Sequence, residues 1–427
     1  MAFEIGLLLF VSLIVMLALD FPIALSLGLS SLITVVAFSL VPLDFVPQLM
    51  FGTADSFTLL AIPFFIFAGL VLGHTSIARR LIDLANCLVG DIPGGFGIVG
   101  VITALFFASM SGSGPAGVAA LGLVLIPAMK RAGYDSGFSS ALMAASGGIG
   151  IIIPPSIALI IYGYIAEVSI AKLFIAGIIP GIIVASSLIL VTFVISHKRG
   201  YRSETRHDGM TTRVAFRRAF WGLLAPVIIL GGIYGGVFTP TEAAAVAVVY
   251  SILIDMIVYR SMKIADLLRI AAEAGVTASV IMAIVVTASL FAWILNTQGI
   301  AAGCASFLVS VTQNRVVLLL LINVLLIGAG LILDAISIFY IFLPILLPVI
   351  RAIGIDPLHF GIIMTINLAI GQVTPPVGVN LIAASGVANI SIKRISRAAV
   401  PFIVGEGCAL LIITFFPELT LFLPGLF

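Results

Sequence analysis

Charged residues are scarce in this chain: Asp, Glu, Lys and Arg make up 9% of its 427 residues, against 62% for hydrophobic types. A soluble globular domain carries far more charge, so this composition excludes one and predicts an integral membrane protein made of helices. A crossing takes about 20 residues, so the chain has room for roughly a dozen crossings. The lipid bilayer is therefore its expected surroundings, and we expect no nucleic-acid partner.

Residues that catalyse reactions or bind transition metals are also few. The three cysteines, Cys87, Cys304 and Cys408, have apolar neighbours and no metal-binding spacing, so we interpret them as packing residues. Only four histidines occur, and the chain has neither a phosphate-binding glycine loop nor a zinc-binding histidine pair. The sequence therefore predicts no enzyme. Any transport must draw its energy from an ion gradient or from another chain.

An internal repeat is present instead. A shift of the sequence by 221 residues, without gaps, superposes prolines, glycines and an aspartate of one half on those of the other. Paired segments interrupted by Gly and Pro in corresponding halves indicate the midplane site of a secondary transporter. The superposed pairs are Pro127 and Pro348, Gly133 and Gly354, Asp135 and Asp356, Gly150 and Gly371, Pro154-Pro155 and Pro375-Pro376, and Pro180 and Pro401.

A tandem proline interrupts one apolar run in each half, at about 134–166 and 357–387. Two adjacent prolines remove two backbone donors, so the carbonyl groups before them lose their helical partners. In lipid those groups must be satisfied. A bound cation is one solution, and Thr374 offers a hydroxyl at the second break; a kink closed by neighbouring helices is the other. Recurrence of the break in both halves favours a functional role.

Short apolar stretches on either side of Ser111-Gly112-Ser113-Gly114 predict a re-entrant hairpin at about 94–130, with a second hairpin at about 316–350. Each half then has five crossings, a hairpin and a broken helix. Because five is odd, the halves have opposite orientations. The expected fold is an all-α polytopic membrane protein with two inverted-topology repeats, at 1–196 and 219–427, joined by a polar linker at 197–218.

The distribution of positive charge tests this topology. If the linker is cytoplasmic, all of the 20 Lys and Arg residues fall on the cytoplasmic side except Lys172, Arg315 and Arg351. This agrees with the positive-inside rule. Both termini are then expected on the periplasmic side. We also expect the segment from Thr75 to Leu88 to lie in the membrane interface, because charged and apolar residues alternate along it at helical spacing.

Acidic residues inside apolar segments are candidates for function. Asp334, at the tip of the second hairpin, either acts as an intramembrane carboxylate or caps the helix that starts near Ala335, and both interpretations remain open. Glu406 in the last span is a weaker candidate, since it is interpreted as solvated or hydrogen-bonded. Thr239 or Thr241 is expected to cap a helix, with Glu242 in its first turn.

Five motifs occur along the chain: 59–65, Ser111-Gly112-Ser113-Gly114, Ile153-Pro154-Pro155-Ser156, 236–243 and 374–378. Together they resemble one family, the large membrane subunit of tripartite ATP-independent periplasmic (TRAP) transporters. The resemblance implies a sodium-driven importer of an organic acid, with an elevator motion, in the bacterial inner membrane. It also implies two partners, a periplasmic substrate-binding protein and a small four-helix membrane subunit, which we expect as a separate chain.

The resemblance also implies site residues. Two or more sodium ions are expected, one held by the first hairpin and break and another by the second. The substrate is expected between them. The short segment Pro115–Val118 departs from many members of the family and favours a larger sugar acid, such as sialic acid, over a C4-dicarboxylate. The implied residues are Ser111, Gly150, Ile153 and Pro155 for one ion; Gly330, Gly371, Thr374 and Val377 for the other; and Ser113, Ser156, Asp334 and Asn380 for the substrate.

Three other functions compete with this one. An autonomous sodium- or proton-coupled carboxylate carrier would work without a binding protein. A membrane subunit of a sodium-pumping decarboxylase would need a buried acid that is essential for chemistry. A channel would need no alternating access, so cross-linking a hairpin to the rest of the protein would leave its flux intact.

Overall fold

The computed structural model describes residues 2–90, 92–201, 210–312, 314–331 and 333–426, and the side chains of 108–111 are not described. These residues form helices and connecting turns, with no strand among the described segments. Six of the described helices are long and apolar enough to cross a membrane, or up to eight if each of two bent helix pairs counts as one span. The predicted all-α polytopic fold is confirmed.

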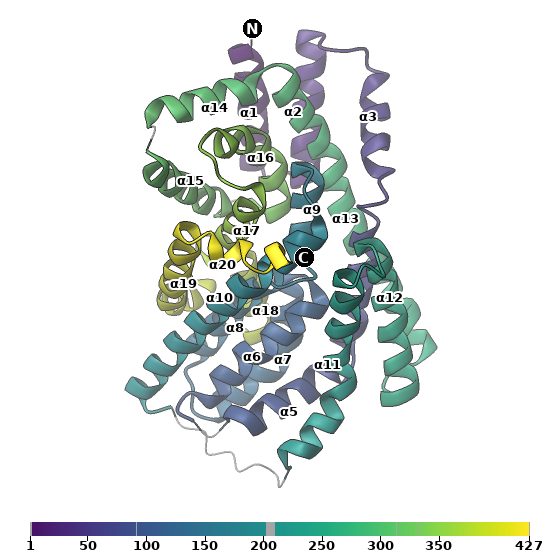
Figure 1. The fold of residues 1–427 in the computed structure, drawn as a ribbon, viewed down its shortest axis with the longest axis vertical. Helices are drawn as coiled ribbons and strands as arrows, with labels where there is room; N and C mark the ends of the chain where they lie inside the picture. Colours follow the sequence, from purple (N-terminus) through teal and green to yellow (C-terminus); the bar gives the residue numbers. More distant parts are fainter. Residues whose placement is uncertain (1, 91, 202–209, 313, 332, 427) are drawn as a thin grey trace.

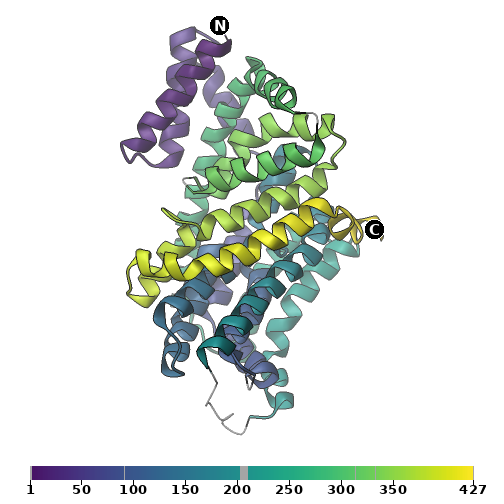
Figure 2. The same ribbon diagram turned by 90° about the vertical axis from the view of Figure 1, so that its left-hand side faces the viewer.

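The molecule is elongated (Figure 1), with α1, α2 and α14 at one end and α5 and α11 towards the other; a view turned by 90° shows the same arrangement (Figure 2). The helices of the first half are α1 (Ala2–Ala18), α2 (Ile23–Phe38), α3 (Phe45–Ala54), α4 (Ala61–His74), α5 (Ile77–Val89), α6 (Gly95–Ser111), α7 (Gly114–Arg131), α8 (Ser136–Ile152), α9 (Ile157–Ala166) and α10 (Ile170–Arg199). Those of the second half are α11 (Thr212–Tyr234), α12 (Pro240–Leu253), the π-helix η1 (Ile254–Tyr259), α13 (Ile264–Thr297), α14 (Ile300–Val311), α15 (Arg315–Gly330), α16 (Ala335–Ala352), α17 (Pro357–Val373), α18 (Val379–Ala388), α19 (Ile392–Phe415), α20 (Glu418–Leu421) and the 3-10 turn η2 (Pro424–Leu426).

Helix bounds repeat at the spacing seen in the sequence. Helices α7 and α16 differ by 221 residues at both ends, and so do α8 and α17. The superposed aspartates have the same role: Asp135 accepts a hydrogen bond from the Phe138 amide, at 3.0 Å, and Asp356 from the Leu358 amide, at 2.7 Å. Both therefore cap the N-terminus of a broken helix. The sequence signal that starts these helices, a capping aspartate, is therefore the same in both halves.

Both predicted breaks are present. Helix α8 ends at Ile152 and α9 begins at Ile157, with a bend of 41° between them. Helix α17 ends at Val373, and α18 begins at Val379 beyond Gly378, whose φ is +49°. Each break contains a tandem proline joined by a cis peptide bond. The loss of two backbone donors interrupts each helix, as the sequence predicts.

Two features differ from the prediction. Helix α14 lies in a region where no helix was expected; it corresponds in the repeat to α5 and is short and buried on one side only. The segment 197–218 is not a linker throughout, because α10 continues to Arg199 and α11 begins at Thr212. Solvated charged residues are compatible with a helix, so α10 continues through the basic residues of its last turn. It ends at Gly200, whose φ is +69°.

The predicted start of α12 is correct in detail. The Thr239 side chain accepts a hydrogen bond from the Glu242 amide, and the Glu242 carboxylate accepts one from the Thr239 amide at 2.8 Å. This is a capping box, which satisfies two backbone donors at the helix start. Thr241 does not cap the helix, because its hydroxyl donates to the Phe57 carbonyl instead.

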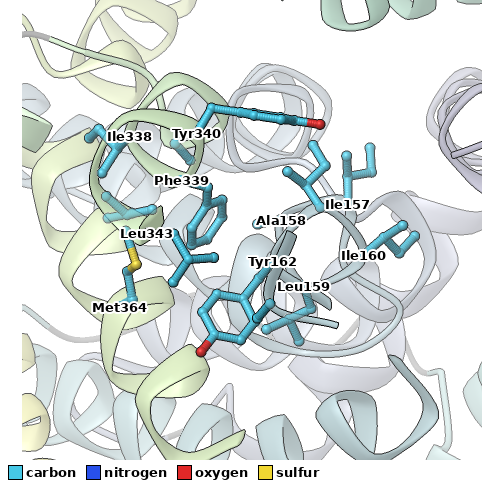
Figure 3. Packing of buried hydrophobic residues seen from close by; sticks show 14 of the residues in the cluster. Ile157, Ala158, Leu159, Ile160, Tyr162, Ile338, Phe339, Tyr340, Leu343 and Met364 are labelled. Carbon is cyan, nitrogen blue, oxygen red and sulfur yellow. The ribbon is translucent and has the colours of Figure 1, made fainter. Parts of the chain in front are cut away.

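Helix α9 of the first half is packed into the second half. Tyr162 of α9 is fully buried, and its hydroxyl donates to the Pro357 carbonyl at 2.6 Å. Its ring meets Phe339 of α16 edge-on, with centroids 5.7 Å apart (Figure 3). The same ring lies against Gly361 of α17, where an added methyl group would come within 2.6 Å of it. The two halves therefore share one core instead of forming separate ones.

We expect Gly361→Ala to lower the free energy of unfolding by about 1–3 kcal/mol, because the new methyl group meets a buried ring that is fixed by its hydrogen bond. The thermal unfolding midpoint of the purified protein measures this. Gly231→Ala is the control, since a methyl group at that helical position meets nothing within 4 Å. Equal midpoints for the two variants would show that the Tyr162 contact is not tight.

Candidate functional site

The tip of the first hairpin lies against the first broken helix. A methyl group on Gly150 of α8 would be 3.1 Å from the Ser113 carbonyl oxygen, and one on Gly112 would be 3.0 Å from the Pro155 carbonyl oxygen. Gly112 also has φ +59°, a conformation that favours glycine. The hairpin tip thus approaches the break by backbone contact, and the carbonyl oxygens of Ser113 and Pro155 lie beside glycines with no intervening side chain.

Two amides from the second half reach the same tip. A methyl group on Gly114 would lie 2.6 Å from Gln372 Oε1 and 3.0 Å from Asn380 Oδ1. Asn380 is fully buried, and its Nδ2 donates to the Ala144 carbonyl at 3.1 Å. Neither amide oxygen has a hydrogen-bond partner among the described residues. The tip of the first hairpin is therefore faced by two buried oxygens that remain free to accept a donor or a cation.

A small cavity lies behind this tip, lined by Ser113, Ser146, Gly147 and Gly150 and by apolar residues of α6, α7 and α8. Ser146 is buried, and its hydroxyl has no hydrogen-bond partner in the part of the chain that the structure describes. The arrangement places polar groups of α8 directly beneath the hairpin tip.

The second hairpin meets the second broken helix in the same way. Gly330 at the end of α15 and Gly371 of α17 touch by backbone alone, since a methyl group on Gly371 would lie 2.8 Å from the Gly330 Cα. Thr374 follows at the break, and its hydroxyl donates to the Ile370 carbonyl at 2.6 Å. Pro375, Pro376 and Val377 beyond it are exposed. Of the expected second ion site, three members are adjacent and Val377 faces outwards.

A side-chain hydroxyl bonds to a helix carbonyl at each break. Ser156 Oγ donates to the Ile151 carbonyl at 2.5 Å and accepts the Leu159 amide at 3.4 Å, so it also caps α9. At the second break the Thr374 hydroxyl donates to the Ile370 carbonyl, and the Thr374 amide donates to the Gly371 carbonyl, which Pro375 leaves without its helical donor. One carbonyl ahead of the prolines is thus paired locally at each break in this conformation. Any bound cation must use the lone pairs that remain on these oxygens.

The structure separates the expected site residues into groups. Ser113, Gly150, Pro155 and Asn380 gather at the first hairpin tip. The Ile153 side chain points to Gly181 of α10 instead, where an added methyl group would collide with it. Ser111 ends α6, and its side chain lies outside the described residues.

Asp334 is a helix cap. Its carboxylate accepts hydrogen bonds from the amides of Ile336 and Ser337, at 2.9 and 3.3 Å, and from the Ser337 hydroxyl at 2.5 Å. It caps α16, which is one of the two interpretations that the sequence left open. Within the described segments, no hydrogen bond joins it to Ser113, Ser156 or Asn380.

A hydrogen-bonded network of buried polar side chains lies in the second half, and the sequence did not predict it. Asn367 Nδ2 donates to Asn323 Oδ1 at 2.9 Å, Asn323 Nδ2 to Thr414 Oγ1 at 3.2 Å, and His359 contacts the Thr414 carbonyl at 3.3 Å. Asn367 lies one turn before Gly371, at the position that Ser146 occupies in the first half. Its Oδ1 has no partner among the described residues. The sequence signal that points to this network is the presence of asparagines inside apolar runs.

An ion pair lies at the N-terminus of the first broken helix. Arg394 of α19 donates to Asp135 at 2.6 Å. Partial burial by itself would raise the pKa of Asp135, but the hydrogen bonds from Arg394 and from the Phe138 amide outweigh it and lower that pKa. The aspartate is therefore ionised at neutral pH, as its capping role requires.

Known proteins similar to this chain are membrane transporters. A family model described as "Tripartite ATP-independent periplasmic transporter, DctM component" matches residues 10–419. The chain is 44% identical over 405 residues to the isethionate TRAP transporter permease protein DctMQ of Oleidesulfovibrio alaskensis, covering 95% of this chain but only 64% of that protein. It is 40% identical over 400 residues to the C4-dicarboxylate TRAP transporter large permease protein DctM of Pseudomonas aeruginosa, covering 94% of each.

Two further similarities extend the comparison. The chain is 38% identical over 385 residues to the sialic acid TRAP transporter large permease protein SiaM of Vibrio cholerae, covering 90% of each. Its structure is similar to the crystal structure of the YdaH transporter of Alcanivorax borkumensis, with a TM-score of 0.65 over 87% of each chain. At 16% sequence identity, the second similarity concerns the fold alone.

We expect Gly330→Ala to destabilise the protein by about 1–3 kcal/mol, because the new methyl group would meet the backbone of Gly371, which cannot rotate away. Gly328→Ala, on the same helix, is the matched control, since a methyl group there meets nothing within 4 Å. Thermal unfolding of the two purified variants compares them. A stability of Gly330→Ala equal to that of the control would mean that the hairpin end is not held against α17.

Proposed function

Because the chain belongs to the DctM family of tripartite ATP-independent periplasmic transporters, it is the large membrane subunit of such a transporter, and we propose that it imports an organic acid driven by sodium. The observation that carries this proposal is the meeting of the first hairpin tip with residues of both broken helices. Gly150 and Pro155 come from one half, and Gln372 and Asn380 from the other. A site shared by two interrupted helices is typical of secondary transporters.

Sodium is the proposed coupling ion, with two or more ions bound. Hard cations bind oxygen ligands, and both hairpin tips lie beside main-chain oxygens and glycines. In the described part of the chain, no group of three or more His, Cys, Asp or Glu side chains is placed to hold a metal ion. The ligands would therefore be neutral oxygens: those of Ser111, Gly150, Ile153 and Pro155 for one ion, and those of Gly330, Gly371, Thr374 and Val377 for the other.

The substrate would lie at the first hairpin tip. Helix α7 begins at Gly114 and α9 at Ile157, and the N-terminus of a helix favours an anionic group. Ser113, Gln372 and Asn380 would add hydrogen bonds, while Asp334 would act by fixing α16. Relatives are named for isethionate, C4-dicarboxylates and sialic acid, all of which are anions at neutral pH. We propose an acid of this group, with sialic acid favoured by the Pro115–Val118 segment.

The remaining parts of the proposal follow from the family. A periplasmic binding protein would deliver the substrate, and a small four-helix membrane subunit would support this chain in the bacterial inner membrane. The isethionate relative is longer than this chain, which leaves room in it for a second component. The hairpins and broken helices would move together as an elevator. Both termini would face the periplasm, with the two inverted repeats joined on the cytoplasmic side.

We expect uptake into proteoliposomes to require three components: an inward sodium gradient, the small subunit and the matching binding protein. Radiolabelled sialic acid, succinate and isethionate, each with its own binding protein, identify the substrate. Uptake that needs no binding protein would favour the autonomous carrier. Flux that survives cross-linking of a hairpin to α13 would favour a channel.

We expect Gln372→Ala to reduce this uptake at least tenfold with little change in the unfolding midpoint, because the Gln372 Oε1 at the hairpin tip has no partner to lose. Gln298→Ala, at the end of α13, is the matched control and should transport normally. Normal uptake by Gln372→Ala would remove this amide from the proposed substrate site.

A further inference from the structure

Glu406 is a buried acid that the transport proposal does not use. It lies in α19, a helix long and apolar enough to span the membrane, and it is 1% exposed. Its neighbours one turn away on the buried face of α19 are Phe402 and Leu410, which belong to the apolar core. The carboxyl therefore lies between two apolar layers, well away from both ends of its helix.

Within the described residues, no group pairs with this carboxyl. Both oxygens of Glu406 lack a hydrogen-bond partner among the described residues, and no ion pair within them includes Glu406. The adjacent Gly405 lies so close to α10 that an added methyl group would be 2.9 Å from the Val191 side chain. Close packing on this side leaves little room for the hydration of a charge.

The helices packed against α19 bring no compensating charge. Helices α8, α10, α17 and α18 pack against α19, and α19 runs beside α10 and α17 in Figure 2. Helix α15 also reaches α19, through the hydrogen bond from Asn323 to Thr414, and its one charged residue, Arg315, is its first. Helices α8 and α18 contain no charged residue, and on α17 His359 bonds to Thr414 and Thr420. The basic residues of α10 and α19 cluster at the helix ends: Lys172, His197, Lys198 and Arg199 on α10, and Lys393, Arg394 and Arg397 on α19. The Cys408 thiol, the other titratable group in the middle of α19, is exposed.

An ionised carboxylate in such a place would be costly, because burial of an unpaired charge is strongly unfavourable, whereas a neutral carboxyl is tolerated. In the first half, the position that corresponds to Glu406 is Ala185 of α10, which is also buried. The contact of Gly405 with Ser187 and Val191 places the corresponding parts of α10 and α19 beside each other. The acid thus occurs in one half only, where the last helices of the two halves meet.

We propose that Glu406 is a proton-binding site inside the membrane. Its carboxyl holds a proton in this conformation and releases it to water, leaving a carboxylate, only when the packing of α19 against α8 and α10 opens. The ligand is the proton itself. This inference does not rest on sodium coupling or on the identity of the substrate, and its tests need neither.

Infrared spectroscopy of the reconstituted protein at neutral pH tests the site directly, because protonated and ionised carboxyl groups absorb at different frequencies. The wild type is expected to show a protonated-carboxyl band that is absent in Glu406→Gln and retained in Glu167→Gln, a control at an exposed helix end. An unchanged band in Glu406→Gln, or a lost ionised-carboxylate band, would overturn the proposal.

Stability provides a second readout. The wild type should lose more thermal stability than Glu406→Gln as pH is raised, because only the wild type has a buried proton to lose. The Glu406→Leu variant should also fold, since a neutral residue of similar size fits an apolar site. If neither neutral variant folds, or if both keep the full pH dependence of the wild type, the carboxyl is not the neutral, unpartnered group proposed here.

Discussion

Backbone polar groups inside a membrane must all find partners, and this constraint shapes the centre of the molecule. Each tandem proline interrupts a helix and removes two donors, so the preceding carbonyls need others. The Ser156 hydroxyl donates to one of them, that of Ile151, and the Thr374 amide to another, that of Gly371. The glycines at 150 and 371 then allow a hairpin end to approach each break. The candidate site therefore lies where the tandem prolines interrupt the helices and deprive backbone carbonyls of their helical donors.

Much of this arrangement was predictable from the sequence, because the restrictions are local. Proline ends a helix wherever it occurs in tandem, glycine permits the turn at Gly112, and an aspartate before a helix caps it. The repeat at 221 residues then gives both halves the same plan. The positions of α7, α8, α16 and α17 followed from such signals alone.

Which side chains meet across the two halves was not predictable. Gln372 and Asn380 lie far from Gly114 in the sequence, and only the tertiary packing brings them together. The sequence left the role of Asp334 open, since a capping aspartate and a functional carboxylate have the same local pattern. Helix α14 was missed because one apolar face over 12 residues gives a weak signal. These gaps all concern contacts that depend on the packing of distant segments.

The contact between Gly330 and Gly371 has a further consequence. A contact between two stretches of main chain involves no side chain, so it constrains only the two positions that must be glycine. The side chains around the other hairpin tip can therefore change during evolution to accept a different ligand while this contact stays the same. Side chains at the first hairpin tip can thus vary without disturbing the contact that positions the second hairpin.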